Sequence, residues 1–371
     1  MSVAVSDILF LLLRVAMQGR EQDFKAADAV VWDKVDWQGI CDWAFAHNVA
    51  AIAFDGVLKL YERNQNLNLC IPKNVKFRLA AHQSALETNS QKHGKAIARL
   101  ASFYKSHDIS MMLLKGYGLS LYYPQPSHRP CGDIDIWLYG EQERADDLLR
   151  RECDVKIDED KHHHTVFYID GIMVENHYDF FNVYAHRSNS VVEKRLKDLA
   201  TEKQMSLNIE GVEVDVPSAN FNALFLLRHA AAHFAAAEIN IRHVLDWALF
   251  VRGCTAEIDW LALDKITRRL NMHRFMYCLN AMSIDCLGFS ETLFASFERD
   301  SKLENRVMKD ILHPEFDEKS NSKNIVGVLY YKLRRWWCNR WKHRIVYNET
   351  LFSTFFVQLW SHILKPKSFL K

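Results

Sequence analysis

Glycine and proline are scarce in this sequence, which has 13 glycines and 7 prolines among its 371 residues. A many-turned all-β architecture needs these residues at its turns, so their scarcity favours helices. The eight cysteines form no C-x-x-C pair and no closely spaced framework, which argues against a cysteine zinc site and a disulfide scaffold. We therefore expect free thiols in a reducing compartment and assign the protein to the cytoplasm.

An excess of charge of one sign is also lacking, because 47 Lys and Arg residues face 46 Asp and Glu residues, for a formal net charge of +1. Binding to a phosphate backbone needs a strong basic excess, so double-stranded DNA is not an expected partner. No apolar run reaches the roughly 18–20 residues that a membrane span needs. The longest uncharged stretch, 350–364, contains several polar side chains, so we expect no transmembrane segment.

The spacing of apolar residues along the chain changes twice. Apolar residues recur at helical spacing before residue 106 and again after residue 216, whereas short apolar runs bounded by turns lie between them. The expected strands are 109–114, 133–138, 165–169, 172–177 and a hairpin over 205–217, with a helix over 142–150. This layout predicts an α+β fold that is mainly α. Its three parts are a helical N-terminal region (1–105), a small mixed-sheet domain (106–216) and a helical C-terminal domain (217–371).

Two acidic residues, Asp133 and Asp135, stand two positions apart in the strand 133–138. Side chains alternate along a strand, so both carboxylates point to one face while Ile134 and Ile136 pack on the other. Two carboxylates about 4 Å apart repel by roughly 4 kcal/mol at an effective dielectric constant of 20. A Mg²⁺ ion compensates this repulsion and keeps positions for water and phosphate, as phosphoryl and nucleotidyl transfer require.

Two other acid-x-acid patterns are weaker candidates for a metal site. Residues 158–160 lie in a polar run without apolar alternation, which is typical of a solvated loop. Glu213 and Asp215 alternate with valines in a hairpin, and this is typical of the solvent-facing side of an antiparallel pair. We therefore place the candidate site at Asp133 and Asp135.

The acidic pair belongs to a longer pattern, which runs through 113–116, Tyr123-Pro124, Arg129 and 132–136. This pattern resembles the DNA polymerase β-type nucleotidyltransferase superfamily, most closely its uncharacterised bacterial branch, over about residues 109–180. The resemblance implies a small nucleotidyltransferase sheet with helical regions on both sides. It also implies Mg²⁺-dependent transfer of NMP from an NTP to a hydroxyl-bearing acceptor. The usual pair of small residues in the turn is here Gly116-Tyr117, and Gly118 is the candidate for the second flexible position.

The resemblance also implies roles for individual residues. The metal and catalytic residues carried over are Asp133, Asp135 and Glu175, which would hold two Mg²⁺ ions. The implied NTP-binding residues are Lys115, Gly116, Gly118 and Arg129. For Lys115 the alternative is a solvated strand end, and for Arg129 a partnership with a nearby acid. His163 and His164 precede a strand next to that of Glu175, so either could reach the site, although a surface loop is the more common place for such a cluster.

In the C-terminal part, His229 and His233 share a helix face, but the H-E-x-x-H pattern of zinc enzymes is not met. With Arg242 and Asp246 they are expected to pack on the sheet or line a substrate cleft. The segment 332–344 interleaves cations with tryptophans, which suits single-stranded RNA or a membrane surface. We prefer a terminal helix that buries its tryptophans and extends its arginines into solvent.

Two functional hypotheses remain. The first is an active transferase whose acceptor is a small molecule, a saccharide, a peptide or RNA. The second is a nucleotide-binding or protein-interaction module of the same fold that has lost catalysis. Neither the base nor the acceptor is encoded in a motif, because specificity depends on the shape of the pocket.

Overall fold

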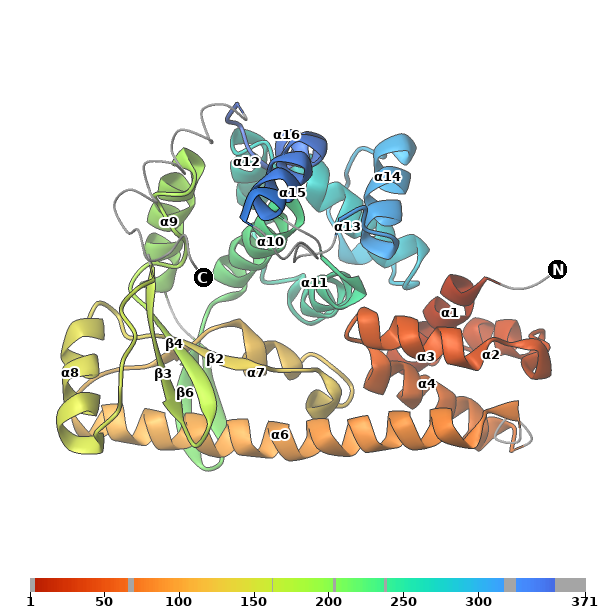
Figure 1. The fold of residues 1–371 in the computed structure, drawn as a ribbon, viewed down its shortest axis with the longest axis horizontal. Helices are drawn as coiled ribbons and strands as arrows, with labels where there is room; N and C mark the ends of the chain where they lie inside the picture. Colours follow the sequence, from red (N-terminus) through yellow and green to blue (C-terminus); the bar gives the residue numbers. More distant parts are fainter. Residues whose placement is uncertain are drawn as a thin grey trace.

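The computed structural model describes residues 4–65, 70–161, 163–202, 205–236, 239–316 and 325–350. The chain is mainly helical and carries one six-stranded mixed sheet (Figure 1), which confirms the predicted α+β class. The helices before the sheet are α1 (Val5–Met17), α2 (Glu21–Asp28), α3 (Trp37–Ala46), α4 (Ala50–Arg63) and α6 (Lys73–Ser106). None of the helices in the described ranges is both long enough and apolar enough to cross a membrane.

Helix α6 has 34 residues and runs along one side of the whole molecule, under the N-terminal helices and then under the sheet (Figure 1). Near its start, Val75 and Leu79 belong to the core of the helical regions. Near its end, Ile97 and Tyr104 belong to the core of the sheet. The boundary expected at residue 105 therefore falls at the end of a helix that is shared by both parts.

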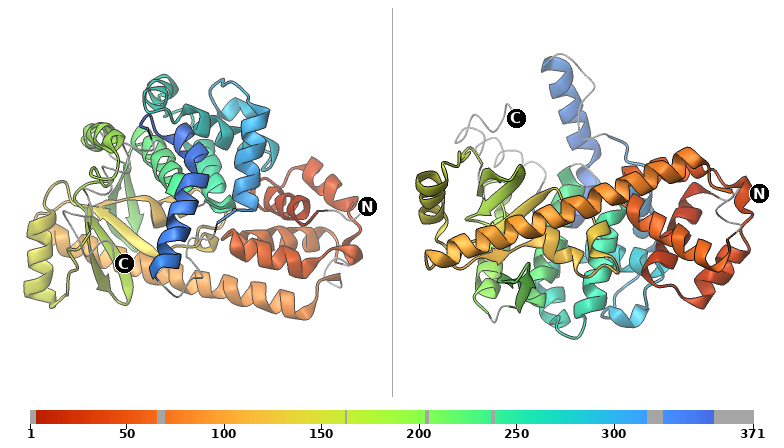
Figure 2. Two further views of the ribbon diagram at one scale, coloured as in Figure 1. Left: turned by 45° about the horizontal axis from the view of Figure 1, so that its top comes forward. Right: turned by 90° about the horizontal axis from the view of Figure 1, so that it is seen from below.

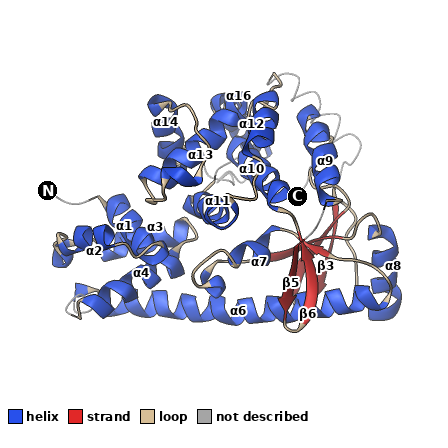
Figure 3. Cartoon of the chain, turned by 180° about the vertical axis from the view of Figure 1, so that it is seen from behind, coloured by secondary structure: helices blue, strands red, loops and turns tan. Residues whose placement is uncertain are grey.

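The sheet contains β1 (Met112–Leu113), β2 (Asp133–Trp137), β3 (His164–Ile169), β4 (Ile172–His177), β5 (Met205–Ile209) and β6 (Val212–Val216). The strands lie in the order β3-β4-β2-β1-β6-β5, and β2 pairs in parallel with β4. Figure 3 shows the strands, in red, gathered near one end of α6. All the predicted strands are present, but the first is much shorter than the expected 109–114. Of the other residues of that run, Ile109, Met111 and Leu114 are buried as coil on either side of β1, and Ser110 is exposed.

The register of the strands decides which side chains share a face. Ile134 lies beside Val174, and both belong to a core closed by α6 and α8 (Gln142–Cys153). Asp135 lies beside Glu175, so these carboxylates share the opposite face. Helices α10 (Ala219–Ala236) and α11 (Ile241–Cys254) lie on the side of the sheet away from α6 (Figures 1 and 2). The acidic face is thus covered by helices from a distant part of the chain.

The remaining helices are α7 (Lys115–Ser120), α9 (Arg187–Ala200), α12 (Trp260–Arg269), α13 (His273–Asp285), α14 (Ser301–Leu312), α15 (Ile325–Cys338) and α16 (Arg340–Val346). The preferred interpretation of segment 332–344 holds for Trp341, whose ring packs against Phe234 at a centroid distance of 5.6 Å. It is wrong for Trp337, whose surface is 50% exposed. Most of the uncharged stretch 350–364 lies outside the described residues.

A pH-dependent contact ties the N-terminal helices to the sheet domain. His128 contacts Asp55 of α4 through Nδ1 at 2.9 Å and Glu87 of α6 through Nε2 at 3.1 Å. Only an imidazolium can donate from both nitrogens. Burial disfavours that charge, but the hydrogen bonds to the two carboxylates outweigh it and raise the pKa of His128 above its usual value.

We expect this contact to stabilise the protein more at low pH. Because the pKa of His128 is raised on folding, its contribution is complete below about pH 6.5 and is lost as the pH rises through the raised value. Urea unfolding of wild type and His128→Gln between pH 5.5 and 9 measures it, and the difference between the two should shrink with rising pH. A difference that is constant across the range contradicts the expectation.

Candidate active site

The centre of the site is the pair of neighbouring parallel strands β2 and β4. Asp133 and Asp135 come from β2, and Glu175 comes from β4, directly beside Asp135 in the register. All three carboxylates line one large cavity, while Ile134 and Ile136 point into the core behind the sheet. The structure therefore brings together the three residues that the sequence put forward as metal ligands.

Asp135 is the most deeply buried of the three, with 1% of its surface exposed. Its Oδ1 lies 3.1 Å from the Lys115 ammonium and 3.0 Å from Nε2 of His177. Burial alone would raise the pKa of Asp135, but these two cations outweigh it and lower the pKa below the usual range. Asp135 is thus held in its ionised form.

His177 is the residue of β4 that follows Glu175 by two positions and lies on the same face. Its Nε2 lies 3.6 Å from the Glu175 carboxylate as well as against Asp135. Burial disfavours the imidazolium, but the hydrogen bond to Asp135 and the nearby Glu175 carboxylate raise the pKa of His177 to about 9. Near neutral pH, His177 therefore carries a positive charge between two carboxylates.

Asp133 lies at the start of β2 and is only partly covered. Burial, and then the negative charge of Asp135, raise the pKa of Asp133. Three carboxylates thus face two cationic side chains, Lys115 and His177, and the balance favours a further cation. The Oδ2 atom of Asp135 is buried and has no hydrogen-bond partner among the described residues. A carboxylate set with a buried, unsatisfied oxygen fits a hard divalent ion such as Mg²⁺.

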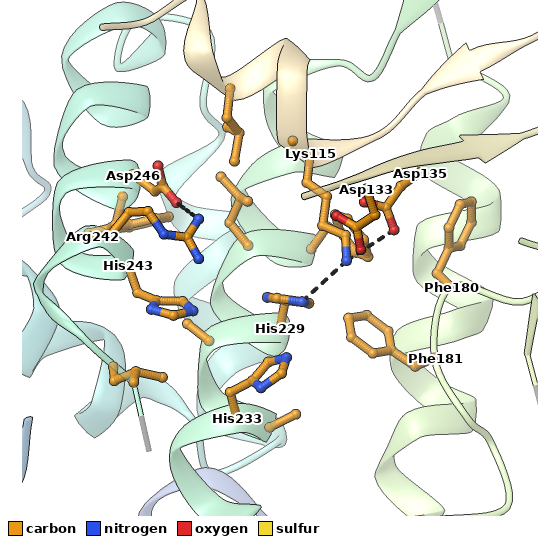
Figure 4. Close-up of a pocket in the computed structure, with 18 of the residues that line it drawn as sticks. Lys115, Asp133, Asp135, Phe180, Phe181, His229, His233, Arg242, His243 and Asp246 are labelled. Atoms are coloured by element: carbon orange, nitrogen blue, oxygen red, sulfur yellow. Dashed lines mark hydrogen bonds and ion pairs between the residues drawn. The ribbon is translucent and has the colours of Figure 1, made fainter. Parts of the chain in front are cut away.

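Lys115 and Gly116 are the first residues of α7, and they form a sharp turn there shortly after β1. Gly116 has φ of 44° and ψ of −113°, a conformation that L-residues with a side chain rarely adopt. This turn directs the Lys115 ammonium to Asp135 and to within 3.4 Å of Nε2 of His229 (Figure 4). Burial would lower the pKa of Lys115, but Asp135 and the other carboxylates raise it, so the ammonium stays charged.

Arg129 is almost fully buried and does not act as a free cation. Its Nε donates to Asp246 Oδ1 at 2.7 Å and its Nη2 to Oδ2 at 2.9 Å, and Nη1 donates to the carbonyl of Gly116 at 3.0 Å. The Tyr123 hydroxyl donates to the same Asp246 at 2.7 Å. Of the two roles considered from the sequence, the structure shows the partnership with an acid. Arg129 fixes the Gly116 turn to α11.

The cavity above the carboxylates has a volume of about 1020 Å³. Its far wall is formed by α10 and α11, from which His229, His233, His243 and Arg242 face it (Figure 4). Burial, followed by the nearby Lys115, lowers the pKa of His229 well below its usual value, so this imidazole is neutral. A cavity of this size is at the upper end of the range for sites that hold small molecules.

The structure does not place every residue expected from the sequence in this cavity. Gly118 does not line this cavity but borders a separate one of about 150 Å³. His163 and His164 do reach the site, whereas His162 lies outside the described residues. His177 is not among the site residues expected from the sequence, although its position could have identified it. His177 follows Glu175 by two residues in a predicted strand, so the two side chains must share a face.

A family model described as an uncharacterised nucleotidyltransferase matches residues 33–288, which is more than half of the chain. The matched range contains the whole sheet together with α10 and α11. The search among curated proteins found no match. A solved structure of an antigenic nucleotidyltransferase-like protein from Paracoccidioides brasiliensis shares 16% sequence identity, with a TM-score of 0.32, over 43% of this chain and 75% of that chain.

Proposed function

The chain belongs to the family of uncharacterised nucleotidyltransferases, and on this premise we propose that it transfers a nucleoside monophosphate from an NTP to a hydroxyl group of an acceptor. The observation that carries the proposal is the row of carboxylates Asp133, Asp135 and Glu175 on neighbouring strands, facing one cavity. We propose these residues as the ligands of two Mg²⁺ ions. When bound, the ions would supply charge neutralisation for the triphosphate and lower the pKa of the acceptor hydroxyl.

Two cationic side chains are placed to bind the triphosphate. Lys115 projects from the turn at Gly116 next to the carboxylates, and Arg242 projects from α11 on the opposite wall (Figure 4). Arg242 lies 3.5 Å from Asp246, but that carboxylate is already held by two shorter bonds from Arg129. Arg242 can therefore turn toward an anion, and we assign it the phosphate contact in place of Arg129.

We assign Glu175 a second role, in which it assists the removal of the proton from the acceptor hydroxyl. It is partly exposed to the cavity, and it lies 3.6 Å from His177. Burial would raise the pKa of Glu175, but His177 and other cations outweigh it and lower the pKa. Glu175 is thus ionised and able to accept a proton. The neutral His229 and the Phe180 and Phe181 rings line the space in which the acceptor would lie.

Transfer of an α-phosphate label tests the proposal. The full chain is incubated with each α-labelled NTP, Mg²⁺ and acceptors of the four classes, and labelled product and released pyrophosphate are measured. We expect both products with Mg²⁺ and neither with excess chelator. Glu213→Gln serves as the matched control for variants of the three proposed metal ligands, because Glu213 is an exposed acid on β6. Its carboxylate accepts hydrogen bonds from Ser206 and Asn208 at the edge of the sheet. This variant should behave as wild type.

Two outcomes contradict the proposal. Mg²⁺-dependent NTP binding by calorimetry without transfer to any acceptor would favour a nucleotide-binding module that has lost catalysis. That alternative is supported by one feature of the site, since Lys115 and His177 already neutralise Asp135 from within the chain. The absence of any NTP binding would exclude both functions.

A further inference from the structure

A cluster of imidazoles borders the carboxylate row on its outer side. His164 of β3 lies directly opposite His177 of β4, and the two rings have centroids 5.1 Å apart. The ring of His163 lies 4.3 Å from that of His164 and 5.7 Å from that of His177. Each of the three offers a nitrogen within 4.8 Å of those of the other two. We call these three residues the histidine cluster.

Glu175 connects the histidine cluster to the carboxylate row. Its Oε1 lies 3.7 Å from Nε2 of His164, and its Oε2 lies 3.6 Å from Nε2 of His177. Two ligands at about 2.0–2.1 Å from one tetrahedral ion are about 3.4 Å from each other. The Glu175 oxygens are therefore close to the separation from His164 and His177 that a shared ion requires.

His164 has a buried polar group that the protein does not satisfy. The residue is 6% exposed, and neither ring nitrogen has a hydrogen-bond partner among the described residues. Its nearest acidic atom, at 3.7 Å, is beyond hydrogen-bond distance. Burying such a group without a partner is costly, so a buried, unsatisfied imidazole needs an explanation. Burial lowers the pKa of His164 to about 4, which leaves the ring neutral, the form that binds metal ions.

We propose that His163, His164, His177 and Glu175 form a site for a divalent ion of borderline hardness, such as Zn²⁺. Imidazole nitrogens select such ions, whereas the oxygen ligands Asp133 and Asp135 suit Mg²⁺. The two sites are neighbours that share Glu175. Binding at the histidine cluster displaces the Nε2 proton of His177 into solvent, takes this nitrogen away from Asp135 and leaves that carboxylate to Lys115 and a hard cation. The proposal does not depend on nucleotide transfer.

Metal titration of the full chain tests this site. The protein is stripped with a chelator and titrated with Co²⁺ while the visible spectrum is recorded, and Zn²⁺ is then added as a competitor. We expect one Co²⁺ ion per chain with nitrogen and oxygen ligation, displaced by Zn²⁺. His164→Gln should weaken Co²⁺ binding by roughly tenfold or more, because loss of even an outer partner of a ligand costs about 10–100-fold.

Two further variants separate the histidine cluster from its surroundings. His233→Gln is the matched control, because His233 lines the same cavity but lies on α10 and is exposed; its Co²⁺ affinity should equal that of wild type. Asp133→Asn should also retain Co²⁺ binding, since Asp133 is not part of the histidine cluster. If circular dichroism shows that His164→Gln is unfolded, His163→Gln replaces it.

Three results overturn the proposal. They are equal Co²⁺ affinity in wild type and the histidine-cluster variant, a spectrum dominated by thiolate charge transfer, and loss of binding in Asp133→Asn as well as in His164→Gln. None of these results bears on Mg²⁺-dependent label transfer. Failure of the histidine site and failure of the proposed transferase activity are therefore distinguishable.

Discussion

Replacement of Asp133 by asparagine should lower nucleotide transfer by roughly 10²–10³-fold without lowering the melting temperature. The loss in rate is of the size seen when a preorganised electrostatic group is removed from an active site. Stability should not fall, because burial and the neighbouring Asp135 raise the pKa of Asp133. A carboxyl whose pKa is raised on folding destabilises the fold when it is ionised, and the variant removes that charge.

The same substitution at Asp135 should have a second effect. Asp135 is buried, and it neutralises His177, which is also buried, and Lys115, which is partly buried. Asp135→Asn leaves these two cations without their shared anion, and removing one partner of a buried pair costs about 3–5 kcal/mol. We therefore expect Asp135→Asn to lose both transfer and stability.

Both variants are measured by thermal unfolding followed by circular dichroism and by α-label transfer with Mg²⁺. A melting temperature that falls equally in both would show that Asp133 is also needed for the fold. Unchanged transfer in Asp133→Asn would show that this carboxylate does not take part in the reaction. The contrast between two residues of one motif thus separates the catalytic role of a carboxylate from its structural role.

The parts of the site that the sequence predicts are those set by local geometry. Asp133 and Asp135 share a face because side chains alternate along any strand, and the same rule places Glu175 on a face of β4. The hairpin turn at Asp170-Gly171 fixes the register of β3 and β4, and both residues adopt positive φ there. Such features need only a few consecutive residues, and the structure contains all of them.

The parts that the sequence does not predict depend on contacts between distant elements. The partnership of Arg129 with Asp246 joins residues 117 positions apart, and no pattern near either residue identifies the other. Helix α6 is buried in two cores, and this burial depends on where the N-terminal helices lie, which no local pattern in its sequence specifies. The charge of His177 arises from its position between Asp135 and Glu175, which the pairing of β2 with β4 creates.

Breaking the Arg129–Asp246 pair should destabilise the whole chain. The pair joins the segment that precedes β2 to α11, and both side chains are at least nine-tenths buried. Burial opposes ionisation of Asp246, but Arg129 and the Tyr123 hydroxyl outweigh it and lower its pKa. Asp246→Leu therefore leaves a buried guanidinium without its anion. We expect a loss of about 3–5 kcal/mol in the free energy of unfolding.

A double-mutant cycle tests whether this loss belongs to the pair. Arg129→Met should also be destabilising, because it leaves Asp246 buried without its main cation. The double variant Arg129→Met/Asp246→Leu should be more stable than the sum of the two losses predicts, since it leaves neither charge unpaired. Urea unfolding at one pH gives the four free energies. Asp42→Asn, which breaks an exposed pair with Arg78, is the control and should not move the unfolding midpoint.

NTP affinity gives this double-mutant cycle a second readout. Arg129 also donates to the carbonyl of Gly116, so it positions the turn from which Lys115 reaches Asp135. The double variant should then keep much of its stability but bind the NTP more weakly, because the turn has lost its anchor to α11. Strictly additive losses in stability would show that the two residues act independently. Wild-type NTP affinity in the double variant would show that the turn holds its shape without Arg129.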